Sequence, residues 1–215
     1  MKFEAFSSRD AASRAAAGYL ETALRRHLRQ HGQAALAVSG GSSPEACFSL
    51  LAQAELPWNK VKITLTDERS IPVSDAASNE GMLRRSLLTR RAAAAEFVPL
   101  QPGALEQLPR PCACTLAGMG EDGHFASIFP DHPDLSSALS PENQELCFPV
   151  TTRASTLPRV SMSLAMLLQS AVIYLLAFGA AKRAIIEAPG ALPVAALLTQ
   201  QRTPVHVLWA PQEPS

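Results

Sequence analysis

Residues 118–130, GMGEDGHFASIFP, gather the residue types that acid–base chemistry needs. Three glycines, Gly118, Gly120 and Gly123, have the G-x-G-x-x-G spacing of a dinucleotide-binding loop. A histidine, His124, follows the third glycine directly. The segment is therefore either a cofactor loop or a flexible support for a catalytic imidazole.

The residues around His124 favour the second interpretation. Glu121 and Asp122 would put two carboxylates beside a bound pyrophosphate, which repels them. A dinucleotide loop also leads into a long helix, whereas Pro130 and Pro133 end this segment early. A neutral imidazole at the end of a strand suits a general base near neutral pH. We expect His124 to be that base.

The segment SGGSSP, residues 39–44, has the composition of an anion-binding loop. Its two glycines let the backbone approach a ligand, and Ser39, Ser42 and Ser43 add hydroxyl donors. No lysine follows the glycines, as a Walker loop requires, and Ala37 stands where the G-x-S-x-G elbow of serine hydrolases has its first glycine. The loop suits a monophosphate; a capped turn without a ligand is the alternative.

A third polar segment is TDERSIP, residues 66–72, which places three consecutive charges after an apolar run. Arg69 could hold a carboxylate or phosphate in bidentate fashion. Asp67 could orient either Arg69 or His124. A solvated turn is the alternative.

These segments depend on elements that alternate along the chain. Apolar periodicity and capping residues predict helices over residues 8–31, 44–54, 79–88, 165–171 and 180–188, with Asn79 as the cap of the third. They predict strands over residues 35–38, 61–66, 114–118, 147–150, 159–163, 172–178 and 205–210. The alternation indicates an α/β fold in three layers: a mainly parallel sheet with helices on both faces, forming a single domain over residues 1–215. Ligands bind outside the carboxyl ends of such strands, where all three segments fall.

Composition limits the classes of partner. Lys plus Arg and Asp plus Glu each number 19, so the neutral chain offers no electrostatic case for nucleic acid or an anionic membrane. No apolar leader precedes residue 8, and the apolar run 171–181 is too short to span a bilayer. Four cysteines lack zinc or redox spacing, which predicts reduced, partly buried thiols in the cytoplasm. His27 and His31 sit among arginines and predict a solvated basic face rather than a metal site.

Taken together, the loops resemble the 6-phosphogluconolactonase family. GMGEDGH followed by A-S-x-F-P is the most specific match, and the others follow the family's order. The motifs that carry the resemblance are SGGSSP (39–44), TDERSIP (66–72), SNEGML (78–83), GMGEDGHFASIFP (118–130), PRVSMS (158–163) and GAAK (179–182).

The resemblance implies a modified Rossmann-like fold, shared with glucosamine-6-phosphate deaminases and ribose-5-phosphate isomerases. It implies hydrolysis of 6-phospho-D-glucono-1,5-lactone to 6-phospho-D-gluconate in the pentose phosphate pathway. No cofactor, metal or obligate protein partner is expected. The implied catalytic residues are His124, Arg69 and Asp67. The implied substrate- and phosphate-binding residues are Ser39, Gly40, Gly41, Ser42, Gly120, Asp122, Gly123, Arg159 and Lys182.

The sequence departs from the family pattern in places. Phe125 stands where the family usually has threonine, and Asp75 and Ala77 replace a common histidine and aspartate. The nearest alternative is an amino-sugar-phosphate deaminase, but Phe129 occupies the place of that enzyme's catalytic glutamate and Arg69 that of a tyrosine. A non-catalytic sugar-phosphate sensor would need a DNA-binding segment, for which we see no room before the first helix.

Overall fold

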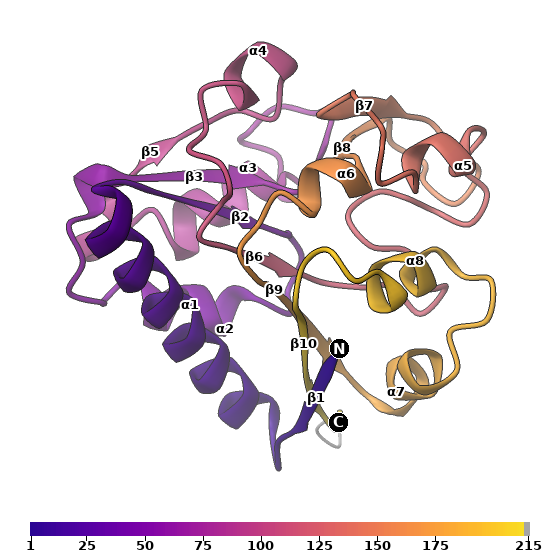
Figure 1. Cartoon of the computed structure of the whole chain (residues 1–215), viewed down its shortest axis with the longest axis horizontal. Helices are drawn as coiled ribbons and strands as arrows, with labels where there is room; N and C mark the ends of the chain where they lie inside the picture. Colours follow the sequence, from indigo (N-terminus) through magenta and orange to yellow (C-terminus); the bar gives the residue numbers. More distant parts are fainter. Residues whose placement is uncertain (213–215) are drawn as a thin grey trace.

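A parallel sheet forms the centre of the computed structural model, which describes residues 1–212 (Figure 1). All neighbouring strands within it run in the same direction. The fold expected from the sequence is confirmed. The seven strands, in spatial order, are β1 (Lys2–Ala5), β10 (Val205–Ala210), β9 (Ile173–Phe178), β6 (Cys114–Ala117), β2 (Ala34–Val38), β3 (Val61–Leu65) and β5 (Glu96–Phe97).

Helices cover both faces of this sheet and give it two separate hydrophobic cores. The first core is closed by α1 (Arg9–His31), α2 (Glu45–Leu51) and α3 (Asn79–Ser86). The second is closed by α4 (Pro102–Leu105), α5 (Leu135–Ala138), α6 (Leu164–Leu167), α7 (Ala180–Glu187) and α8 (Pro193–Thr199). The chain also contains two short 3-10 turns, Trp58–Lys60 and Arg90–Ala94.

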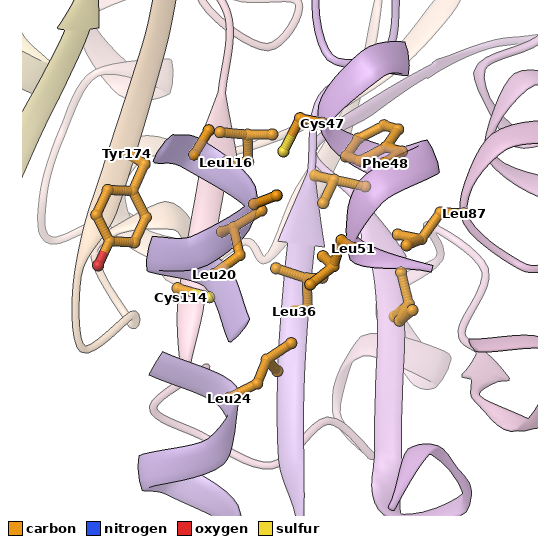
Figure 2. Packing of buried hydrophobic residues seen from close by; sticks show 14 of the residues in the cluster. Leu20, Leu24, Leu36, Cys47, Phe48, Leu51, Leu87, Cys114, Leu116 and Tyr174 are labelled. Atoms are coloured by element: carbon orange, nitrogen blue, oxygen red, sulfur yellow. The ribbon is translucent and has the colours of Figure 1, made fainter. Parts of the chain in front are cut away.

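Strand β2 shows how one strand supplies both cores. Leu36 belongs to the first core and Ala35 to the second, because successive side chains of a strand point to opposite faces. In Figure 2, Leu20 of α1 and Phe48 of α2 lie over this strand with Leu36. All three side chains are fully buried. Burial on both faces explains why the central strands read as continuous apolar runs.

The ends of α1 follow from its sequence. Ser8 Oγ accepts a hydrogen bond from Ala11 N at 3.1 Å, as an N-cap should. Gly32 ends the helix with φ 74°, a left-handed conformation that glycine adopts at low cost. The expected helix is therefore confirmed at both ends.

A small antiparallel sheet stands beside the main one, and the sequence did not reveal it as a unit. Its strands are β4 (Asp67–Arg69), β8 (Arg159–Met162) and β7 (Cys147–Val150). Segment 66–72 therefore contains a strand rather than a turn. The pairing sets Arg69 opposite Arg159, which brings two distant cations to one place.

Other expectations need correction. Strand β1, strand β5 and helix α8 were not predicted. Helix α2 ends at Leu51 rather than near residue 54, and Ser78, not Asn79, caps α3 through Gly81 N. All four cysteines are buried, with Cys147 the most exposed at 7%, and all are free.

His27 also differs from expectation, because it is buried rather than solvated. Its ring lies 4.3 Å from that of His31, and burial is the main cause that lowers its pKa. Among the described helices, none is long and apolar enough to cross a membrane.

Candidate active site

The three polar loops meet in one cleft of about 270 Å³ at the carboxyl edge of the main sheet. The cleft contains every residue named as a candidate from the sequence except Asp122 and Gly123. Its lining residues are Ser39, Gly40, Gly41, Ser42, Ser43, Asp67, Arg69, Asn79, Gly118, Met119, Gly120, His124, Ala126, Arg159 and Lys182.

His124 is held by its own loop. Its Nδ1 lies 2.6 Å from Asp122 Oδ1, which also accepts a 3.2 Å hydrogen bond from the His124 backbone N–H. The ring packs on Phe129 with a centroid separation of 4.4 Å. A carboxylate can only accept, so the proton of the neutral imidazole sits on Nδ1 and Nε2 keeps its lone pair. Asp122, which the resemblance placed among the substrate-binding residues, does not line the cleft itself and holds the histidine through this contact.

The glycines of this loop make room for protein side chains. A Cβ at Gly120 would lie 2.3 Å from ring atoms of His124 and 2.4 Å from Asp122 Oδ1. A Cβ at Gly123, which has φ 75°, would lie 2.7 Å from Leu192 Cβ. Two glycines of the G-x-G-x-x-G spacing therefore make room for His124, Asp122 and Leu192.

The loop after β2 lines the same cleft as this histidine loop, and a Cβ at Gly118 would lie 3.3 Å from Ser39 Oγ. Ser39 N donates to Leu116 O at 2.8 Å, which continues the pairing of β2 with β6 to the start of the loop. Gly41 then takes the left-handed conformation with φ 87°. Lys182, in the first turn of α7, lines the same cleft, and burial lowers the pKa of its ammonium. A partly desolvated cation attracts an anion strongly.

Asp67 binds Arg159, not Arg69 or His124 as the sequence suggested. The Asp67 carboxylate is buried; Oδ2 accepts from Ser127 Oγ at 2.7 Å and lies 3.6 Å from Arg159 Nη1. Burial is the main cause that lowers the pKa of Arg159, and nearby Arg69 acts in the same direction. The Arg159 guanidinium thus lies between the Asp67 and Glu68 carboxylates, which favour its charge, and Arg69, which opposes it.

Strand β4 is joined to the start of α3 by each of its residues. Asp67 O accepts a hydrogen bond from Asn79 Nδ2 at 2.8 Å, and Arg69 Nη1 donates one to Ala77 O. The Glu68 carboxylate accepts from Arg69 N, Ser78 Oγ, Asn79 N and Glu80 N at 2.6–3.1 Å. We call this set of contacts the β4–α3 clasp.

Sequence reasoning missed three residues here: Glu68, Asn79 and Ser127. The SNEGML motif was a signal for Asn79, but only the fold shows that it faces the cleft. No sequence signal pairs Ser127 with Asp67. Among residues 1–212, no group of three or more His, Cys, Asp or Glu side chains is placed to hold a metal ion.

Comparison with known proteins identifies the family of this chain. The family model described as "Glucosamine-6-phosphate isomerases/6-phosphogluconolactonase" matches residues 7–209. The chain belongs to this family. Within it, the chain is 41% identical to a 6-phosphogluconolactonase from Caulobacter vibrioides, over 98% of this chain and 97% of that protein. It is 37% identical to one from Mesorhizobium japonicum, over 97% and 95% of the two chains.

Solved structures show the same family fold. The crystal structure of a 6-phosphogluconolactonase from Shewanella baltica aligns with a TM-score of 0.92 and 33% identity, covering 98% of this chain and 97% of that one. A monomeric glucosamine-6-phosphate deaminase aligns with a TM-score of 0.77 at 16% identity, over 99% and 98% of the chains. The second likeness shows the fold alone.

Proposed function

We propose that this protein hydrolyses 6-phospho-D-glucono-1,5-lactone to 6-phospho-D-gluconate, within the pentose phosphate pathway. One observation carries the proposal: a histidine whose Nδ1 is held by Asp122 faces a cleft that also contains Arg69, Arg159 and Lys182. A neutral base beside three cations suits an anionic substrate that must be attacked by water.

The phosphate is the anchor of this substrate. We place it between the Ser39–Ser42 loop, Arg159 and Lys182, because these groups offer hydroxyl, amide and cationic donors within the cleft. Binding energy from this remote group fixes the lactone carbonyl beside His124.

Hydrolysis then needs a base and an oxyanion partner. His124 Nε2 takes a proton from water as the water oxygen bonds to the lactone carbonyl carbon. Arg69, which lines the cleft, stabilises the resulting oxyanion. When the tetrahedral intermediate collapses, the bond from that carbon to the ring oxygen breaks. His124 returns its proton to the ring oxygen, and the new carboxylic acid ionises to release one proton.

The deaminase alternative lacks an acid–base group at the expected place. Phe129 occupies the position of the catalytic glutamate, and its buried ring packs against His124 and lies 5.3 Å from the Arg159 guanidinium carbon. An apolar ring cannot shuttle the protons that ring opening and isomerisation require. Plain hydrolysis needs no such group. We further propose that the enzyme acts in the cytoplasm, where its buried, free thiols stay reduced.

A lactonase assay tests the function. The lactone is generated from glucose 6-phosphate by its dehydrogenase, and its decay is followed with and without the protein, because it also hydrolyses spontaneously. We expect clear acceleration that falls by about 10²–10⁴-fold in His124→Asn. His31→Asn, at an exposed helix position, is the matched control and keeps full activity. Activity of His124→Asn near that of the wild type would remove His124 from the mechanism.

A failure of the wild type to accelerate decay would reject the lactonase assignment. Ammonia release from glucosamine 6-phosphate would then be measured as the alternative activity. Binding of 6-phosphogluconate without either reaction would point to the sensing role.

A further inference from the structure

Asn79 is a buried cleft residue to which the proposed mechanism gives no role. It is the first residue of α3, only 2% of its surface is exposed, and it lines the cleft beside Arg69. Its backbone N–H is bound by Glu68 Oε1 at 2.8 Å. Both its main chain and its side chain are therefore held by the β4–α3 clasp.

The orientation of the Asn79 carboxamide is fixed by chemistry. Nδ2 donates to Asp67 O at 2.8 Å, and a backbone carbonyl can only accept, so the other atom is the carbonyl oxygen. Within residues 1–212, no protein group donates a hydrogen bond to Oδ1. The atom is also not buried, so a ligand in the cleft can reach it. An acceptor that is unsatisfied by the protein but accessible from the cleft is available to a ligand.

Gly40 shows how close this carboxamide lies to the phosphate loop. A Cβ at Gly40 would lie 2.0 Å from Asn79 Oδ1 and 2.6 Å from Nδ2. Gly40 therefore lacks a side chain because the carboxamide occupies that space. Asn79 stands between the phosphate loop on one side and Asp67 and Arg69 on the other.

We propose that Asn79 is a specificity-determining residue that accepts a hydrogen bond from the 4-hydroxyl of the sugar lactone through Oδ1. This inference rests on the proposed function, which puts phosphate on the loop and the lactone carbonyl near Arg69 and His124. A phosphate dianion and a lactone carbonyl have no proton to donate, so the donor must be a ring hydroxyl. The 4-hydroxyl is the ring hydroxyl nearest to the phosphorylated end.

The test compares two lactones that differ only at carbon 4, those made by oxidising glucose 6-phosphate and galactose 6-phosphate. We expect the wild type to prefer the gluco lactone. Asn79→Ala breaks the Nδ2–Asp67 O bond for both lactones and removes the 4-hydroxyl contact for the gluco lactone alone. Its kcat/KM should therefore fall about tenfold further for the gluco lactone than for the galacto lactone, the loss expected for one hydrogen bond, so the preference disappears.

Two further variants separate recognition from folding. Asn79→Asp keeps an acceptor oxygen toward the cleft but loses the donor to Asp67 O and adds a negative charge near the phosphate, so both lactones should show a higher KM while the gluco preference survives. Asn59→Ala, at an exposed asparagine in the Trp58–Lys60 turn, is the matched control and should change neither lactone. Equal losses for both lactones in Asn79→Ala would overturn the proposal, as would an unchanged preference.

Binding keeps the proposal testable if hydrolysis fails. Calorimetric titration with 6-phosphogluconate and 6-phosphogalactonate needs no turnover. A gluco preference in the wild type that Asn79→Ala removes supports the 4-hydroxyl contact even if the lactonase assignment is wrong. No preference in the wild type, or one that Asn79→Ala retains, rejects the contact.

Discussion

Asp122 Oδ1 lies 2.6 Å from His124 Nδ1, and the loop that carries both residues is closed by a 2.9 Å hydrogen bond from Gly120 N to His124 O. The pair is thus set by local geometry. Helix α8 supports the loop from outside, because Val194 N donates to Gly123 O at 3.0 Å. The proposed base and its orienting carboxylate are therefore held in one hydrogen-bonded loop.

Replacing the Asp122 carboxylate should disable the base without weakening substrate binding. In Asp122→Asn, the amide can donate to Nδ1, which moves the imidazole proton to Nε2 and removes the lone pair that accepts from water. We expect kcat to fall by at least about 100-fold while KM stays within about threefold. Glu121→Gln removes the same charge from the same loop and should keep kcat. A kcat for Asp122→Asn close to that of the control would show that the carboxylate is not needed.

Lys182 should make phosphate binding sensitive to alkaline pH. Burial lowers the pKa of Lys182, so its positive charge is lost at a lower pH than that of an ordinary lysine. Because the charged form binds phosphate, affinity for 6-phosphogluconate should be full below this pKa and weaken as the pH rises through it. Calorimetry between about pH 7 and about pH 10 measures the decline.

Two substitutions test whether Lys182 causes this decline in affinity. Lys182→Arg keeps its charge over this range, so the alkaline decline should become smaller. Lys182→Ala should raise KM with little change in kcat. If 6-phosphogluconate binds Lys182→Ala as tightly as the wild type, Lys182 is not a phosphate ligand.

Glu68 should contribute to stability through the β4–α3 clasp. Its two oxygens accept four hydrogen bonds, three of them from backbone N–H groups. In Glu68→Gln, an NH2 group replaces one of the two acceptor oxygens. Because this group cannot accept the hydrogen bonds that the oxygen accepted, N–H groups at the start of α3 lose their partner. We expect the free energy of unfolding to fall by about 1–3 kcal/mol, measured by urea denaturation.

A surface glutamate provides the control for that experiment. Glu21 forms an exposed ion pair with Arg25 four residues along α1, and Glu21→Gln should change stability by less than about 1 kcal/mol. If the two substitutions lower the free energy of unfolding equally, the clasp contributes no more to stability than an exposed ion pair does. A rise in KM for Glu68→Gln is also expected, because the clasp positions Arg69 and Asn79.

The sequence predicted those parts of the molecule that follow from local rules. Strand β2 and the loop at Ser39 were found because apolar burial and glycine content are local signals. The same holds for α1, with its Ser8 cap and Gly32 stop. His124 was singled out because its loop carries carboxylates that a pyrophosphate site would not.

The parts that were missed depend on contacts between distant segments. Asp67 was expected to orient Arg69 or His124, yet its partners Ser127 and Arg159 lie 60 residues or more away along the chain. Strand β4 has only three residues, and its existence depends on pairing with β8. His27 looked solvated because its neighbours are arginines. None of these pairings leaves a periodic trace in the sequence.

The glycine contacts give a last prediction, in which one Gly→Ala substitution should harm activity and another should help stability. At Gly120 a Cβ would meet His124 and Asp122 within 2.4 Å, so Gly120→Ala must displace the proposed base, and we expect kcat to fall at least about tenfold. The matching substitution for stability is at Gly18, inside α1, where a Cβ would meet nothing within 4 Å.

Gly18→Ala should therefore raise the free energy of unfolding by about 0.5–1 kcal/mol and leave kcat unchanged. Lactonase assays and urea denaturation on both variants measure the two effects. Wild-type kcat in Gly120→Ala would show that the position of His124 is not critical, and a loss of stability in Gly18→Ala would contradict the packing of α1.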